Sequence, residues 1–199
     1  MGLVLQKAQI AEDLLSTFVK VFRNRRGSLA YSVIFVGALL AATTGIVGAS
    51  VVTLAVLAFP SMMHHKYNQS ISLGTIAAVG TLGQIIPPSI VLIILGDLMM
   101  VDIGDLFLGA LLPGLMLVFL YTLYIFVLTL IKPRLFPLPS SDLLSEPCAR
   151  LGDVLKNIAP PILLIILILG GILMGFASPT ESAAAGGVGA LLIATTRGR

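Results

Sequence analysis

Apolar runs long enough to cross a lipid bilayer constrain this chain more than any other feature. They cover residues 28–59, 71–100, 106–131, 158–176 and 177–196. A hydrocarbon core about 30 Å thick needs about 20 consecutive apolar residues in a helix. Only 11% of the 199 residues are charged and the mean hydropathy is +1.07, whereas a soluble domain carries about twice that share of charge. The sequence therefore predicts an all-α polytopic membrane protein in a lipid bilayer.

The same composition argues against several other functions. The net charge of +3 comes from small basic clusters beside apolar runs, so nucleic-acid binding is not expected. The single cysteine, Cys148, excludes an internal disulfide and a metal site built from several thiolates. The adjacent His64 and His65 lack further ligands, and neither lies beside a plausible nucleophile. We therefore expect neither an enzyme nor a protein that needs a cofactor.

Basic residues flank the first apolar run on both sides, with Lys20 and Arg26 before it and Lys66 after it. Lys and Arg concentrate in cytoplasmic loops, so both ends of this run are expected on the cytoplasmic side. The pattern predicts a re-entrant helical hairpin over residues 27–62. Its tip is expected near residues 44–48, where two glycines lie among small residues. Such backbone is tolerated at membrane depth only where protein or a water-filled cavity surrounds it.

The second run contains the sequence Gly-Thr-Leu-Gly-Gln-Ile-Ile-Pro-Pro-Ser at residues 80–89. Proline has no N–H and its ring clashes with the preceding helical turn, so a helix must break here. The sequence predicts a discontinuous transmembrane helix over residues 70–105, made of two half-helices. Its break is expected to meet the hairpin tip at mid-depth.

The rest of the chain completes a multi-pass topology. Residues 1–26 are predicted to be an interfacial amphipathic helix with a basic loop, and the polar end of a spanning helix is the alternative. Residues 106–131 form a transmembrane helix with Pro113 near its start, and 132–157 form a cytoplasmic loop with a second amphipathic helix. Residues 158–199 are predicted to form two transmembrane helices. Between these two helices, Glu181 is expected to serve as a helix cap or packing residue at a turn.

Two broken helices in succession indicate an ion-binding and anion-binding function. Unwound carbonyls with hydroxyl neighbours suit a hard cation such as Na⁺, and a half-helix N-terminus suits a carboxylate. Glycines and prolines that only kink or pack helices are the alternative. The predicted cation ligands are Thr44, Gly45, Gly48, Gly80, Thr81 and Gly83, and the predicted carboxylate site is Pro88 and Ser89.

The motifs carry a family likeness. Residues 80–90 are followed by Asp-Leu-Phe at 105–107, Leu-Pro-Gly at 112–114 and Pro-Thr-Glu-Ser-Ala-Ala at 179–184. In this combination the chain resembles the large membrane (permease) subunit of TRAP transporters, the tripartite ATP-independent periplasmic carriers. The likeness runs through essentially the whole chain.

The resemblance implies an elevator-type importer with two inverted repeats, located in the bacterial inner membrane and coupled to Na⁺. It implies a small TRAP membrane subunit and a periplasmic substrate-binding protein as partners, and an organic acid such as a C4-dicarboxylate or sialic acid as substrate. It adds Pro87 to the sodium ligands. Many members have a serine-rich hairpin tip, whereas residues 46–48 here are Ile-Val-Gly, so backbone carbonyls are expected to serve instead.

Large subunits of that family are considerably longer, so the chain resembles a fragment holding the first repeat and the start of the second. Two other functions stay open on the sequence alone. One is a single-component cation-coupled anion carrier of similar architecture. The other is a non-transporting membrane scaffold or a truncated relic. The carboxylate carried and the choice between sodium and proton as coupling ion also stay open.

Overall fold

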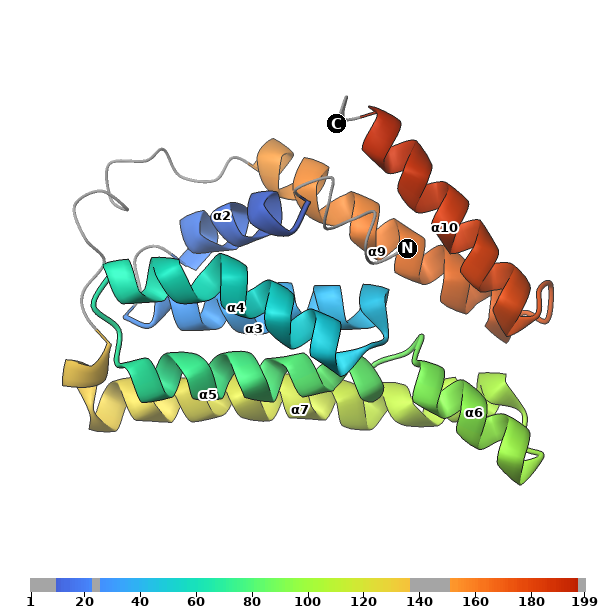
Figure 1. Ribbon diagram of the computed structural model, residues 1–199, viewed down its shortest axis with the longest axis horizontal. Helices are drawn as coiled ribbons and strands as arrows, with labels where there is room; N and C mark the ends of the chain where they lie inside the picture. The colour runs from blue at the N-terminus through green and yellow to red at the C-terminus, as the bar shows by residue number, and fades with distance from the viewer. Residues whose placement is uncertain (1–9, 23–25, 137–150, 197–199) are drawn as a thin grey trace.

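A computed structural model describes residues 10–22, 26–136 and 151–196 of the chain, and these residues form helices and short connections (Figure 1). The helices follow one another in the order α2 (Ile10–Phe22), α3 (Ser28–Thr44), α4 (Val47–His64), α5 (Gln69–Gly80), η1 (Thr81–Gln84), α6 (Ile90–Met99), α7 (Ile103–Ile131), η2 (Pro133–Leu135), α9 (Leu151–Leu173) and α10 (Pro179–Thr196).

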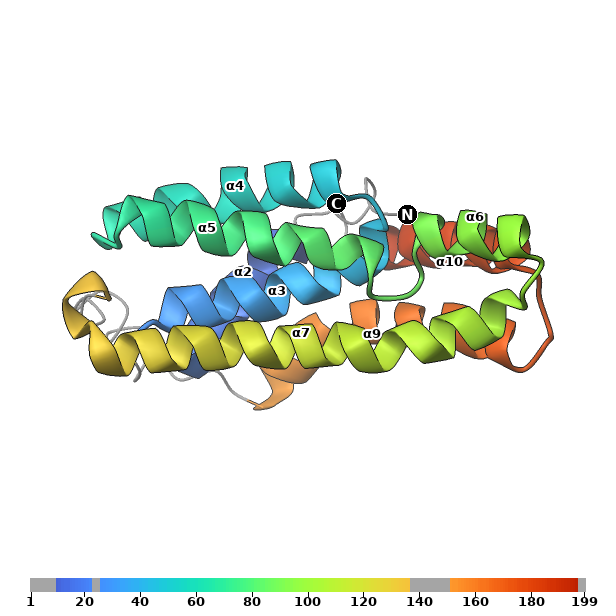
Figure 2. The same ribbon diagram turned by 90° about the horizontal axis from the view of Figure 1, so that it is seen from below.

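Helix α3 is the centre of the packing. Figure 2 shows it between the α4–α5 pair and α7, and Figure 1 shows α2 on a further side. Most of its side chains are buried around the whole circumference, as expected for a helix that is apolar on every face. Side chains that contact it from α4 and α5 include Leu54 and Val79, both buried.

Helices α3 and α4 form a helical pair joined by two residues. Gly45 ends α3 with φ +62°, and its N–H donates to the Ala41 carbonyl at 3.0 Å. This left-handed conformation is one that glycine adopts without steric cost. Helix α4 begins at Val47 and continues through Pro60 to His64. The chain thus turns back within the stretch where the glycines predict a tip.

The next apolar run is interrupted. Helix α5 ends at Gly80, a 3₁₀ turn covers Thr81–Gln84, and α6 starts only at Ile90. The intervening residues include the cis peptide bond between Pro87 and Pro88. Neither proline has an N–H to donate to an α-helical ladder, which is why the regular helix stops before them.

Helix α7 begins three residues before the predicted start at residue 106. Pro113 therefore lies in the interior of a 29-residue helix and not near its start. Asp102 sets the earlier start, because its carboxylate accepts a hydrogen bond from the Asp105 N–H at 3.2 Å and caps the first turn.

The segment after α7 also differs from the prediction. Helix α9 starts at Leu151, inside the predicted loop 132–157, and passes through Pro160 and Pro161 without ending. The predicted second amphipathic helix is therefore, from Leu151 onward, the first part of a long apolar helix. Its remaining residues, before Leu151, lie outside the described residues.

Helix α2 packs on α3 and α9. Its buried face carries Leu14 and Val19, while Phe18 and Phe22 stack on Phe35 of α3 with ring centroids 5.8 and 5.5 Å apart. The Asn157 amide of α9 donates to Thr17 Oγ1 at 2.9 Å.

Three helices among the described residues are long and apolar enough to cross a membrane. They are α4, α7 and the segment Val154–Leu173 of α9. Helices α3 and α6 are apolar but shorter, and α10 is not among the three. This is consistent with a polytopic membrane protein.

The exposed charged side chains at the connections between helices differ in sign between the two ends of the molecule. The start of α3, the α4–α5 turn and the end of α7 lie at one end in Figure 1, and the α6–α7 and α9–α10 turns lie at the other. The first end carries exposed Arg26, Lys66, Lys132 and Arg134, and the second carries exposed Asp97, Asp102, Asp105 and Glu181. This separation is typical of a helical membrane protein whose basic end faces the cytoplasm.

Tyr67 joins three segments at the basic end. Its phenol oxygen accepts a hydrogen bond from the Leu29 N–H at 3.4 Å. Its ring meets Phe136 edge-on, with centroids 5.9 Å apart. Burial raises the pKa of the Tyr67 phenol, although hydrogen bonds with Ser28 and Leu29 act in the opposite direction.

Candidate functional site

The turn between α3 and α4 lies directly against the break between α5 and α6. A methyl group on Gly45 would lie 3.2 Å from the Pro88 carbonyl oxygen and 3.7 Å from the Ile90 nitrogen. A methyl group on Gly83 would lie 3.5 Å from the Ala41 carbonyl oxygen and 3.6 Å from Ser50 Oγ. The absence of a side chain at Gly45 thus allows the turn to approach the break closely, whereas a methyl group on Gly83 would make ordinary van der Waals contact.

Two hydroxyl groups lie side by side in this region. Thr44 Oγ1 and Ser50 Oγ are 2.6 Å apart, and Ser50 is fully buried. Thr44 Oγ1 lies 2.9 Å from the Leu40 carbonyl oxygen, and Ser50 Oγ lies 3.0 Å from the Ile46 carbonyl oxygen. The Leu40 carbonyl also accepts a hydrogen bond from the Thr43 hydroxyl at 2.9 Å, so Thr44 Oγ1 can donate to Ser50 Oγ while Ser50 Oγ donates to the Ile46 carbonyl.

Helix termini of both polarities meet at the same place. Helix α3 ends at Thr44, while α4 begins at Val47 and α6 begins at Ile90. Neither α4 nor α6 has a side-chain cap at its start. The Ser89 hydroxyl, which is buried, donates instead to the Gln84 carbonyl at 2.8 Å. The N–H groups at the two helix starts therefore depend on other partners, which gives the junction anion-binding character beside its carbonyls.

The structure brings only some of the predicted site residues together. Thr44, Gly45, Gly83, Pro88 and Ser89 lie at the junction, and Pro87 is buried beside it. Ser50 is missing from the predicted set. It lies six residues after Thr44, and only the turn at Gly45 brings the two hydroxyls into contact.

The other predicted ligands have different surroundings. Gly80 is pressed against α4, where an added methyl group would overlap Val51 Cγ2 and lie 3.2 Å from Val51 Cα. Gly48 is exposed, and a methyl group there would meet nothing within 4 Å. Thr81 is exposed, and its hydroxyl donates to the Ala78 carbonyl at 2.6 Å. Gly80 is thus a packing glycine, and Gly48 and Thr81 lie at the margin of the junction.

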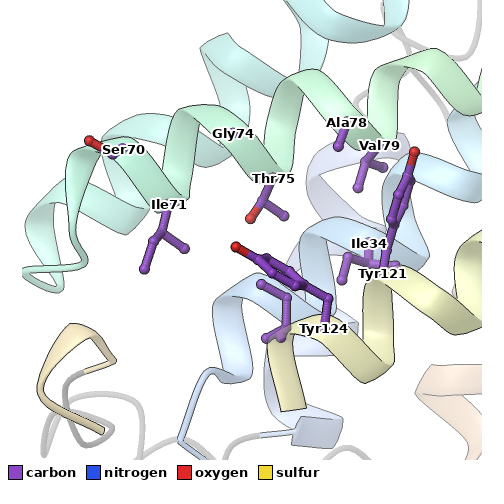
Figure 3. A pocket seen from close by; sticks show the side chains of 10 residues that line it. Ile34, Ser70, Ile71, Gly74, Thr75, Ala78, Val79, Tyr121 and Tyr124 are labelled. Carbon is purple, nitrogen blue, oxygen red and sulfur yellow. The ribbon is translucent and has the colours of Figure 1, made fainter. Parts of the chain in front are cut away.

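A separate groove of about 330 Å³ lies between α5 and α7, with Ile34 of α3 in its lining (Figure 3). Tyr124 extends across it toward Thr75, and Gly74 leaves one wall open. This groove contains none of the predicted ion or carboxylate ligands. The predicted ligands therefore make the junction of the two irregular segments, and not this groove, the candidate site.

Glu181 has a structural role at the start of α10. Its carboxylate accepts hydrogen bonds from the Ser178 N–H and the Ser178 hydroxyl, both at 2.8 Å. The Glu181 N–H lies 3.3 Å from Ser178 Oγ. This reciprocal arrangement is a capping box, in agreement with the capping role predicted from the sequence.

Comparison with known proteins gives the same family as the motifs. Residues 1–199 match the family model described as the tripartite ATP-independent periplasmic transporter, DctM component. The chain is 32% identical over 172 residues to the C4-dicarboxylate TRAP transporter large permease protein DctM of Vibrio cholerae, an alignment that covers 85% of this chain and 36% of that protein.

Relatives with other names are similar as well. The ectoine TRAP transporter large permease protein TeaC of Halomonas elongata is 29% identical over 92% of this chain and 41% of that protein. The sialic acid TRAP transporter large permease protein SiaM of Vibrio cholerae is 29% identical over 98% of this chain and 44% of that protein. The chain thus spans less than half the length of each of these relatives, all of which are transport permeases and not enzymes. Its match over all 199 residues shows that the chain belongs to the DctM family of TRAP transporter large permeases.

Proposed function

We propose that this chain contributes one half of the ion and substrate site of a sodium-coupled TRAP importer for small organic acids. The observation that carries the proposal is the contact between the α3–α4 turn and the break after α5. Backbone at this contact leaves the regular helix on both sides, and a membrane protein stabilises such backbone where it lines a cavity or binding site.

The oxygen atoms at the contact favour a cation. Thr44 Oγ1, Ser50 Oγ and the carbonyls of Leu40 and Ile46 form a cluster of oxygen atoms at the turn. Oxygen ligands of this kind suit hard cations, and the C-terminal end of α3 adds partial negative charge. We assign the sodium site to this cluster together with the backbone of Gly45 and Gly83. Gly48, Thr81 and Pro87 complete the proposed set, and Gly80 contributes through packing.

The helix starts at the contact favour the substrate carboxylate. Ile90 begins α6, and its nitrogen is the one that approaches Gly45. The first N–H groups of a helix bind anions through both hydrogen bonding and the helix dipole. We therefore propose that a carboxylate binds at Pro88, Ser89 and the first turn of α6, beside the cation that neutralises it.

The family implies the remaining parts of the machinery. We propose that the complete permease works with a small TRAP membrane subunit and a periplasmic binding protein in the bacterial inner membrane. The end that carries Arg26, Lys66, Lys132 and Arg134 would face the cytoplasm. The relatives are named for C4-dicarboxylate, ectoine and sialic acid transport, so these three compounds are the first substrates to test.

Uptake into proteoliposomes tests the proposal. The complete permease, its small subunit and its binding protein are reconstituted, and uptake of each labelled compound is measured with an inward Na⁺ gradient or with K⁺ in its place. We expect uptake of one acid with Na⁺ and little with K⁺. Ser50→Ala should raise the Na⁺ concentration needed for half-maximal uptake, and Ser70→Ala, which removes an exposed hydroxyl from α5, should not. Equal uptake without Na⁺ would refute the sodium coupling.

A further inference from the structure

An aromatic groove of about 520 Å³ lies on the outside of the bundle, between α2 and α3 on one side and α7 on the other. We call it the aromatic groove. Its first wall includes Phe22, Tyr31 and Phe35, and its second wall includes Phe119, Leu123 and Phe126. The volume lies within the range of about 300–1,000 Å³ that is typical of ligand clefts. The groove is distinct from the junction proposed to bind the ion and the substrate.

The first wall is held in place by stacked rings. Phe22 lies 5.5 Å from Phe35 and 5.8 Å from Tyr31 between ring centroids. Tyr31 is buried, whereas Phe119 and Phe126 on the second wall are exposed. The groove therefore has one packed wall and one open wall, and its open side lies along α7, which is long and apolar enough to span a membrane.

The groove leads to the basic end of the molecule. At that end, α3 begins beside the last turn of α7. A methyl group on Gly27 would lie 3.0 Å from Thr129 Cγ2 and 3.6 Å from Phe136 Cδ1. Arg26 directly precedes this contact, while Lys132 and Arg134 directly follow α7, and all three are exposed. Three basic side chains thus lie beyond one end of an apolar groove.

The distance between the groove and the charges fits one leaflet of a bilayer. Phe119 precedes Lys132 by 13 residues, which in a helix corresponds to about 20 Å. Half of a hydrocarbon core is about 15 Å thick. A molecule with an anionic head at the basic end would thus place its apolar part beside Phe126, Leu123 and Phe119.

We propose that the aromatic groove binds an acyl chain of an anionic phospholipid whose phosphate lies among Arg26, Lys132 and Arg134. Charge complementarity selects this occupant over an apolar helix of another protein, because a helix would leave the three basic side chains without an anion. The bound lipid would join the start of α3 to the end of α7 and stabilise the contact at Gly27.

Lipid titration of the delipidated complete permease tests the proposal. Binding and Tm are measured with phosphatidylglycerol, with phosphatidylcholine of the same acyl chains, and with glycerol phosphate alone. Each basic residue near an anionic lipid contributes about a fivefold preference, so three should favour phosphatidylglycerol by roughly a hundredfold at low salt. Glycerol phosphate should not raise the Tm, because it lacks the chain. Equal affinity for the two lipids, or the same stabilisation by glycerol phosphate, would overturn the proposal.

Substitutions test the contributions of the basic residues and of the groove to lipid binding separately. Arg26→Gln/Lys132→Gln/Arg134→Gln should abolish the preference for phosphatidylglycerol, while Thr122→Trp, which fills the groove, should weaken both lipids. Tyr124→Leu changes an exposed aromatic residue on α7 outside this groove and serves as the matched control. A benzophenone amino acid in place of Phe119 gives a second readout that does not depend on these variants. A crosslinked phospholipid supports the proposal, and a crosslinked polypeptide refutes it.

Discussion

The packing of α5 against α4 predicts that the same glycine-to-alanine change has opposite effects on stability at two positions of α5. Gly74 and Gly80 both lie in α5. Gly74 faces open space, whereas a methyl group on Gly80 would overlap Val51 Cγ2 and lie 3.2 Å from the backbone at Val51 Cα. We expect Gly74→Ala to stabilise the protein and Gly80→Ala to destabilise it, although the chemical change is the same.

The magnitudes follow from two opposing effects. Replacing a helical glycine by alanine stabilises by about 0.5–1 kcal/mol, because alanine loses less backbone entropy on folding. Overpacking at a tight contact costs about 1–3 kcal/mol. Gly74→Ala should show only the first effect, whereas Gly80→Ala should show both, for a net loss of about 1–2 kcal/mol. The two variants should thus differ by roughly 2 kcal/mol, or about 2 °C in Tm for a permease more than twice as long as this chain.

The assay is thermal unfolding of the complete permease in detergent, followed by circular dichroism. A double variant tests the cause, because Val51→Ala removes the methyl groups that Gly80→Ala would overlap. Gly80→Ala should then cost about 1 kcal/mol less in the Val51→Ala background than in the native one. Equal Tm values for Gly74→Ala and Gly80→Ala, or an unchanged cost in the double variant, would show that the close approach of α4 and α5 is wrong.

Three further predictions concern the junction, the basic end and the topology. Gly83→Val should crowd Ser50 Oγ and the Ala41 carbonyl and weaken the sodium dependence of uptake more than Thr81→Val, because the Thr81 hydroxyl is exposed and bonds to the Ala78 carbonyl at the end of α5. The reverse order would contradict the proposed cluster. Tyr67→Phe should lower stability by about 1 kcal/mol near neutral pH, since Leu29 loses its hydrogen-bond acceptor. The pKa of the Tyr67 phenol is raised above 10.0, so the contribution of this phenol to stability is complete below about pH 10 and is lost at higher pH. Tyr67→Phe should therefore also reduce the fall in Tm between about pH 9 and pH 11. An unchanged fall would argue against this cause. Finally, single cysteines at Arg26 and Lys66, in a chain with Cys148 replaced by serine, should react with an impermeant thiol reagent from the same side of the membrane, and a cysteine at Asp102 should react from the opposite side; labelling of Arg26→Cys and Lys66→Cys from opposite sides would refute the hairpin.

The places where the helices stop are predictable from the sequence because their causes are local. Pro87 and Pro88 have no N–H wherever the rest of the chain lies, and Gly45 allows a left-handed turn without help from a neighbour. The Asp102 cap is also a local effect, but it can be recognised in the sequence only if the start of α7 is predicted at residue 103 and not at residue 106.

The residues that meet across the turn are harder to predict. Ser50 joins Thr44 only after the chain has reversed, and the tight fit of Gly80 is set by Val51 of another helix. The sequence alone makes Gly48 and Gly80 look equivalent, although one is exposed and the other is covered. The start of α9 is misplaced for a related reason, because Leu151 and Leu155 have the spacing of a surface helix and also continue the apolar helix that follows.

Helix α3 has to exist for some time without the helices that later surround it. The chain is synthesised from its N-terminus, so α3 is made before α5 and α7, against which it packs. Two of its hydroxyl groups do not depend on those neighbours for a hydrogen bond. The Ser32 hydroxyl donates to the Ser28 carbonyl at 2.8 Å and the Thr43 hydroxyl donates to the Leu40 carbonyl at 2.9 Å, both within α3. A newly made α3 therefore has no unsatisfied hydroxyl at these two positions before α5 and α7 pack against it.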